Sequence, residues 1–150
     1  MAIGEICSRQ VVFARRGESV RDAARLMREH HVGALVIVDE RDGLRVPVGI
    51  ITDRDIVVAV VAKGLDADEL RVEELMIGEL TTAGEAEGVS ECIARMRARG
   101  VRRMPVVDAR GALVGILAAD DLLDLLAEEL SGLARTIANE QRHEVQARIA

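Results

Sequence analysis

Nine residues decide the fold of this chain, the stretch Val48-Gly49-Ile50-Ile51-Thr52-Asp53-Arg54-Asp55-Ile56. Apolar residues lead into Thr52, and an apolar segment continues after Asp55 to about Ala62, which predicts a strand that turns into a helix. Thr52 and Asp55 stand three positions apart, which is the spacing of a capping box. A helix start with a hydroxyl and a carboxylate is also a place where a phosphate and sugar hydroxyls can bind. The local sequence leaves both interpretations open, a structural cap and a ligand site.

A related stretch recurs sixty-six residues later, so that Gly49 corresponds to Gly115 and Asp55 to Asp121. Upstream the offset becomes 69 residues, and the matched pairs there are Met27 with Met96, Asp39 with Asp108, and Cys7 with Met76. The change in offset places three extra residues in a turn of the first copy, where a loop can absorb them. An internal repeat takes precedence over other signals, and it predicts two copies of one unit.

Length and composition describe two small units that share one body. The chain has 150 residues, and because a unit of about 60 residues is only marginally stable alone, the halves should pack together. The hydrophobic fraction of 49% and charged fraction of 31% are those of a globular protein, and no apolar run approaches the roughly 20 residues that span a bilayer. Met1 to Cys7 lacks the basic flank and long apolar core of a signal peptide. We therefore expect a cytoplasmic protein with no membrane segment.

Charge and aromatic content argue against nucleic-acid binding. A net charge of −6 provides no general basic surface, and Phe13 is the only aromatic residue available for base stacking. Cys7 and Cys92 occupy apolar positions of the two repeats, so we expect buried, reduced thiols rather than a disulfide or metal site. His30 and His31 have no third ligand nearby in sequence and are interpreted as surface residues at a helix end.

The hydropathy pattern predicts the same order of elements in both copies. In the first copy we expect strands at residues 11–13, 34–38 and 46–51, with helices at 20–30 and from Thr52 to about Lys63. In the second copy we expect strands at 80–82, 104–107 and 112–117, with helices at 89–99 and after Asp121. Ser19 is the expected N-cap of the first helix, and Gly64 and Gly100 are expected to end helices. Each copy is thus a β-α-β-β-α unit.

This unit, in tandem, resembles the CBS domain pair, or Bateman module, a regulatory module named after cystathionine β-synthase. The resemblance covers roughly residues 3–127, and the phrase GVRRMPVVD from Gly100 to Asp108 is very close to the family pattern. It implies an α+β fold with α/β layers, in which repeats at 3–63 and 72–127, joined by a linker at 64–71, pack as a pseudo-twofold pair. It also implies clefts for adenosine-containing ligands and frequent dimerisation into a disc.

The resemblance implies that each cleft takes its ribose-binding aspartate from one copy and its base pocket from the other. The cleft expected to bind more strongly combines a carboxylate, hydroxyls and guanidinium groups. Its residues are Thr52, Arg54, Asp55, Thr81, Val101, Arg102 and Arg103. The cleft expected to be weak, empty or suited to an uncharged adenosyl group has Ala118 where the other has Thr52. Its residues are Phe13, Val32, Gly33, Ala34, Asp120 and Asp121.

The expected function is that of a regulatory module that binds an adenosyl ligand, has no catalysis of its own and signals to an unidentified partner protein. The sequence shows no nucleophile with a base, no acid–base pair and no metal cluster. AMP, ADP, ATP, NAD and S-adenosylmethionine all remain open as the ligand. One alternative is a structural adaptor with degenerate clefts that acts only through dimerisation. An enzyme that turns over one of these nucleotides is a second alternative.

Residues 128–150 lie outside the resemblance and should form a C-terminal helical extension. No proline follows Asp121 and only Gly132 weakens the helix, so the last helix should continue well past the core. An apolar stripe runs along it, made of Leu126, Leu130, Leu133 and Ile137 and, after a polar break at Gln141, Val145 and Ile149. Such a stripe needs a surface to cover. We expect that surface to be a second subunit of a homodimer, with docking on the chain's own core as the alternative.

Overall fold

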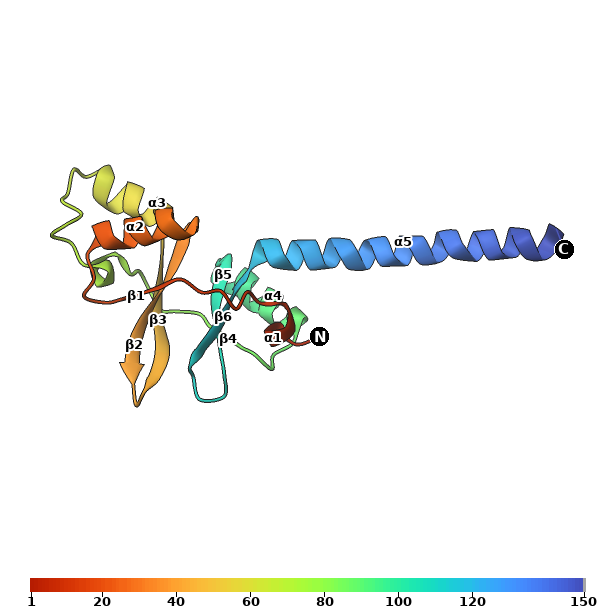
Figure 1. Ribbon diagram of the computed structural model, residues 1–150, viewed down its shortest axis with the longest axis horizontal. Coiled ribbons are helices and arrows are strands. Elements are labelled where there is room, and N and C mark those ends of the chain that lie inside the picture. Colours follow the sequence, from red (N-terminus) through yellow and green to blue (C-terminus); the bar gives the residue numbers. More distant parts are fainter. Residues whose placement is uncertain (150) are drawn as a thin grey trace.

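The computed structural model describes residues 1–149, and it contains both predicted repeats (Figure 1). The first repeat consists of β1 (Phe13–Arg15), α2 (Val20–His30), β2 (Ala34–Arg41), β3 (Leu44–Thr52) and α3 (Asp53–Ile56), followed by a π-helical turn (Val57–Val61). The second consists of β4 (Ala83–Gly84), α4 (Val89–Arg99), β5 (Arg103–Val107), β6 (Leu113–Ala118) and α5 (Ala119–Ile149). A helical turn precedes each repeat, α1 (Ile3–Ile6) and a 3-10 turn (Val72–Leu75). The α+β fold and the β-α-β-β-α order are confirmed.

Each repeat forms a three-stranded sheet, in the orders β1-β2-β3 and β4-β5-β6. The first strand of each sheet is parallel to the second, and the second is antiparallel to the third. The first strands begin later than predicted, at Phe13 rather than residue 11 and at Ala83 rather than residue 80. Ahead of β1, the Val12 carbonyl oxygen still accepts a hydrogen bond from the Val36 N–H of β2 at 3.1 Å, whereas Ser8 pairs with Ile116 of β6 in the other repeat.

Local capping fixes where the helices begin and end. The Ser19 hydroxyl accepts a hydrogen bond from the Asp22 N–H at 3.1 Å, as its predicted N-cap role requires. Helices α2 and α4 end at left-handed residues, His31 with φ 55° and Gly100 with φ 65°. The helical segment after Thr52 ends at Val61, slightly earlier than predicted.

The two repeats are joined by an exchange of their lead-in segments. Ile3 and Cys7 pack in the core of the second repeat, whereas Val72 and Leu75 pack in the core of the first. The Ile3 N–H also donates to the carbonyl oxygen of Glu87 in the second repeat at 2.8 Å. Neither sequence repeat therefore completes its core alone, which is the physical reason that the halves stay together.

Gly49 and Gly115 occupy matching positions where the exchanged segments cross β3 and β6. A Cβ atom at Gly115 would lie 2.6 Å from the Cys7 Sγ and 2.9 Å from the Ser8 carbonyl oxygen. At Gly49 it would lie 2.3 Å from the Met76 Sδ. The glycine in the defining stretch is thus explained by the close passage of another part of the chain.

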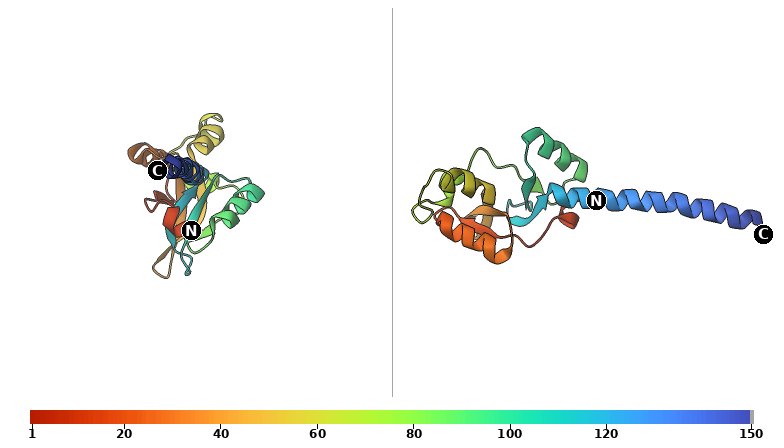
Figure 2. Two further views of the ribbon diagram at one scale, coloured as in Figure 1. Left: turned by 90° about the vertical axis from the view of Figure 1, so that its right-hand side faces the viewer. Right: turned by 90° about the horizontal axis from the view of Figure 1, so that it is seen from above.

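Helix α5 continues without a break through Gly132 to Ile149 and projects from the body as a long rod (Figures 1 and 2). Leu122 is its last buried residue, and the side chains of the apolar stripe beyond it are exposed, from 44% at Leu126 to 81% at Ile149. The alternative that the helix docks on its own core is therefore wrong for the described residues, and Ala150 lies outside them. Neither α5 nor another helix within residues 1–149 has the length and hydropathy of a membrane span.

Candidate functional site

Two clefts lie between the repeats, and matching residues line them. The β3 cleft is lined by Val48, Gly49, Ile50, Met76, Ile77, Gly78, Glu79, Leu80, Thr81, Val101 and Arg103. The β6 cleft is lined by Ser8, Gln10, Val11, Val12, Val32, Gly33, Ala34, Arg103, Ile116 and Ala118. Their cavity volumes are about 90 and about 230 Å³. Each cleft combines the third strand of one repeat with the segment that precedes the first strand of the other.

Three of the residues predicted for the stronger site, Thr81, Val101 and Arg103, line the β3 cleft. Its opposite wall is β3, whose last residue is Thr52. Thr52 and Asp55 are not among the lining residues, and they stand two or more positions beyond Ile50, where the wall ends. The walls of the β3 cleft therefore come from both repeats, and the role of Asp55 in this cleft stays a prediction.

The capping-box interpretation of the defining stretch is correct. The Asp55 N–H donates to the Thr52 Oγ1 at 3.1 Å, and the Thr52 N–H donates to the Asp55 Oδ2 at 2.8 Å. In the second repeat the Ala118 N–H donates to the Asp121 Oδ2 at 3.0 Å, but Ala118 has no hydroxyl to accept the return bond. A carboxylate can accept several hydrogen bonds, so the cap orients Asp55 without using all its acceptor positions.

Arg102 and Asp120, predicted for opposite clefts, contact each other instead. The Arg102 Nη2 lies 3.2 Å from the Asp120 Oδ1, and the side chains are 74% and 63% exposed. The Ala119 N–H donates to the Arg102 carbonyl oxygen at 2.8 Å, which ties the segment before β5 to the start of α5. The pair therefore lies outside the lining of both clefts, and so does the exposed Arg54.

Arg103 lines both clefts. Its side chain is half-buried, and within residues 1–149 it makes no hydrogen bond or ion pair with another side chain. The repeats match Arg103 with Ala34, which is why the sequence predicts no basic group in the β6 cleft. The structure instead places Arg103, from the second repeat, among the residues that line this cleft.

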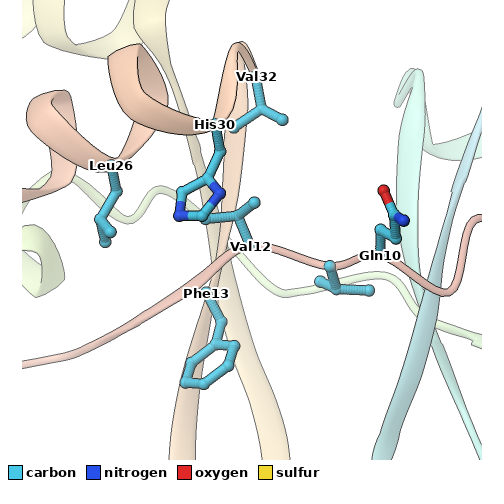
Figure 3. Close-up of a pocket in the computed structure, with 7 residues that line it drawn as sticks. Gln10, Val12, Phe13, Leu26, His30 and Val32 are labelled. Atoms are coloured by element: carbon cyan, nitrogen blue, oxygen red, sulfur yellow. The ribbon is translucent and has the colours of Figure 1, made fainter.

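Phe13, predicted for the β6 cleft, is not among the residues that line it. It lines a neighbouring surface pocket of about 510 Å³ beside α2, which Leu26 and His30 also line (Figure 3). The guanidinium of Arg45 lies over its ring, 3.9 Å from the centroid. This pocket shares Gln10, Val11, Val12 and Val32 with the β6 cleft, so Phe13 lies beside that cleft rather than in its lining.

Sequence reasoning missed the two segments that form the floor and entrance of the clefts, residues 8–12 and 76–80. A signal for them existed, because the 69-residue offset already matches Cys7 with Met76. What the offset could not show is that each segment crosses to the other repeat. Val32, Gly33 and Ala34 line the β6 cleft, where the sequence places them.

The two cysteines are buried, and the walls of the β3 cleft contain groups suited to noncovalent binding. Burial raises the pKa of the Cys92 thiol to about 11 and also raises that of Cys7, so both stay protonated at neutral pH. In the part of the chain that the structure describes, no group of three His, Cys, Asp or Glu side chains could hold a metal ion. The walls instead provide aliphatic surface, backbone groups, the Thr81 hydroxyl and one guanidinium. These groups can hold a flat base, a sugar and an anion.

The family profile of the CBS domain matches this chain twice, over residues 3–62 and 72–128. Uncharacterized protein MK0525 of Methanopyrus kandleri is 38% identical over 125 residues, a match that covers 83% of this chain and 62% of that protein. CBS domain-containing protein YhcV of Bacillus subtilis is 31% identical over 141 residues, which cover 93% of this chain and 96% of that protein.

A solved structure with the same fold is the CBS domain pair of protein MJ0100 in complex with 5′-methylthioadenosine and S-adenosyl-L-methionine. It has a TM-score of 0.73 and 30% sequence identity, and the match covers 86% of this chain and 98% of that one. With both repeats matched by the family profile, this chain belongs to the CBS domain family as a tandem CBS domain pair.

Proposed function

We propose that this CBS domain pair is a non-catalytic regulatory module of the cytoplasm that binds an adenosine-containing ligand and signals to a partner protein. The observation that carries the proposal is Arg103, a half-buried residue that lines two crosswise clefts and makes no side-chain hydrogen bond or ion pair within residues 1–149. A half-buried cation without a counter-ion is suited to an anionic ligand group. The ligands bound to the MJ0100 pair support the adenosyl class.

The β3 cleft contains the groups that a nucleotide needs. Ile50 and Val101 offer aliphatic surface for the base, and Arg103 with the Thr81 hydroxyl offers donors for a phosphate. Asp55, oriented by its cap, is the proposed acceptor for ribose hydroxyls at the end of β3. AMP, ADP, ATP and NAD each contain these three parts.

Both cavities are smaller than the roughly 300 Å³ at which ligand pockets usually begin, so a ligand must displace side chains. In the β3 cleft Met76 lies against Gly49 and fills the space, and its unbranched side chain can move aside. The β6 cleft has the larger cavity and lacks the Thr52 hydroxyl at the matching Ala118. We propose that it accepts an adenosyl group without a phosphate, such as S-adenosylmethionine.

Sharing Arg103 should couple the two clefts. One guanidinium cannot donate fully to anions in both places, so a phosphate held in the β3 cleft lowers the affinity of the β6 cleft for a second anion. An uncharged ligand in the β6 cleft should not be affected in this way. The proposed pair of ligands is therefore one nucleotide and one adenosyl compound without phosphate.

Thermal shift measurements test the ligand class. AMP, ADP, ATP, NAD, S-adenosylmethionine and 5′-methylthioadenosine are added separately, and at least one should raise the melting temperature, because binding to the native state alone stabilises it. No shift at millimolar concentration of all six would favour a structural adaptor. Conversion of one of them, followed by chromatography, would show an enzyme.

Titration calorimetry tests the residues. Arg103→Ala should lower the affinity for the nucleotide that binds by about tenfold or more, the usual loss for a hydrogen-bonded charge. Arg102→Ala is the matched control, because Arg102 lies outside both clefts. Asp55→Ala should abolish the tighter site and Asp121→Ala should leave it. An equal loss in Arg102→Ala and Arg103→Ala, or the reverse result for the two aspartates, would overturn the assignment.

The proposal includes self-association as a homodimer. Val57, Val58 and Val61 in the π-helical turn are 56%, 52% and 66% exposed, and the apolar side chains of α5 add a second exposed surface. Light scattering gives the mass, and copurification from the native cell would identify the target protein. A monomer at micromolar concentration would contradict this part of the proposal and leave the ligand proposal intact.

A further inference from the structure

The apolar stripe of α5 is continuous with a groove at the base of the helix. The groove lies between α4 and the start of α5, has a volume of about 430 Å³, and is lined by Ile93, Met96, Leu122, Leu123 and Leu126 among others. Leu123 and Leu126 also begin the exposed stripe that continues to Ile149. Apolar side chains thus extend from the groove along the rod to Ile137 and, after the polar break at Gln141, resume at Val145 and Ile149.

The charges along α5 differ between its two ends. Residues 119–129 contain the five carboxylates of Asp120, Asp121, Asp124, Glu128 and Glu129 and no basic residue. Residues 135–149 contain three arginines and two glutamates. Within the helix, Arg148 forms an ion pair with Glu144. The first end is therefore strongly acidic and the second end slightly basic.

We propose that the α5 helices of two copies pair antiparallel, and that the last turns of each helix lie in the groove between α4 and α5 of the other copy. The charge pattern favours this direction, because a parallel pair would place ten carboxylates side by side, whereas an antiparallel pair places each acidic end beside a basic end. The groove favours it too, since the partner's Val145 and Ile149 reach the groove only if the helices run in opposite directions.

The length of the helix fits this arrangement. The 27 residues from Leu123 to Ile149 extend about 40 Å at 1.5 Å per residue, and full overlap places the twofold axis near Thr136. Ala127 of one copy then lies opposite Val145 of the other. The two globular bodies lie at opposite ends of the pair, so they do not collide.

Chemical cross-linking tests the direction. Ala127→Cys and Val145→Cys are mixed in equal amounts and treated with a bis-maleimide that spans about 10 Å, which tolerates a shift of one or two helical turns. The native Cys7 and Cys92 are buried and should not compete. We expect cross-links between position 127 of one chain and position 145 of the other, identified by mass spectrometry of the linked peptides.

Two outcomes would overturn the proposal. The first is cross-links that join position 127 to 127 and position 145 to 145, which indicate a parallel pair. The second is the absence of cross-links between chains. Asn139→Cys, on the opposite face of the helix, is the control that should not cross-link.

The proposal rests on self-association, so light scattering is run on Leu130→Glu with Asn139→Glu as its matched control. Loss of dimer mass in Leu130→Glu alone supports the helix pair, and equal dimer mass in both variants argues against it. A monomeric wild-type chain would instead contradict self-association itself.

Discussion

Replacing Gly115 with alanine should destabilise the protein more than the same change at the matching Gly49. At Gly115 the new Cβ would lie 2.9 Å from the carbonyl oxygen of Ser8, a backbone atom, and 2.6 Å from the Cys7 Sγ. The same backbone is held by two hydrogen bonds to β6, Ser8 N–H to the Ile116 oxygen at 3.0 Å and Ile116 N–H to the Ser8 oxygen at 2.9 Å. At Gly49 the nearest atom is the Sδ of Met76, which a side-chain rotation moves away.

The expected magnitude follows from these contacts. Overpacking of a close-packed site costs about 1–3 kcal/mol, and weakening one backbone hydrogen bond adds about 1 kcal/mol. Gly115→Ala should therefore lower the free energy of unfolding by about 2–4 kcal/mol. Gly49→Ala should lower it by less than about 1 kcal/mol, because methionine repacks easily and alanine also reduces the entropy of the unfolded chain.

Urea unfolding followed by circular dichroism measures both free energies. Cys7→Ala combined with Gly115→Ala removes the sulfur contact but not the contact with the Ser8 oxygen, so it should restore only part of the lost unfolding free energy. Met76→Ala combined with Gly49→Ala should remove the whole cost of the alanine at position 49. Equal stability of Gly115→Ala and Gly49→Ala would refute the idea that a crossing backbone, rather than a flexible side chain, requires glycine at position 115.

Three further predictions concern capping, pH and thiol reactivity. Thr52→Ala should cost about 1 kcal/mol of unfolding free energy by removal of the cap, whereas Ala118→Thr should add a similar amount, as urea unfolding will show. Burial raises the pKa of Glu87, but the hydrogen bond from Arg95 and other donors outweigh it, so the folded pKa lies below the ordinary value of 4.5. The stability that this carboxylate contributes is thus present above about pH 4.5 and lost as the pH falls through the folded pKa. Melting curves should show that Arg95→Leu loses less stability on acidification than the unchanged protein. An equal loss of stability in both would contradict this origin. Alkylation of Cys92 at neutral pH should occur only on unfolding, so the alkylation rate should rise with urea along the unfolding curve. Rapid modification of the native protein would contradict the burial of Cys92.

Much of the fold could be predicted because its signals are local or repeated. The capping box spans four residues and is satisfied by hydrogen bonds within that span, so Thr52 and Asp55 reveal it directly. The order of elements follows from hydropathy, and the internal repeat checks each assignment against its copy. The continuation of α5 past Gly132 is likewise a matter of helix propensity and the absence of proline.

The candidate site was predicted less completely because it depends on contacts between distant segments. Arg103 and Ala34 match in the repeat, yet Arg103 lines both clefts. Arg102 differs from Arg103 by one position along the chain, and this is enough to turn its side chain to the surface beside Asp120. Phe13 likewise lies in a neighbouring pocket beside α2, which shares Val12 with the β6 cleft.

The sequence by itself determined the two repeats, their elements, the caps and the long final helix, because each of these depends on neighbouring residues or on comparison of one copy with the other. Only the tertiary structure decided that Ile3 packs in the second core and Val72 in the first, that Arg103 lines two clefts, and that α5 leaves its own body. The physical reason is that an apolar residue is buried equally well against any complementary surface. Hydrophobicity shows that Ile3 and Val72 must be covered, but only the path of the chain determines which core covers them.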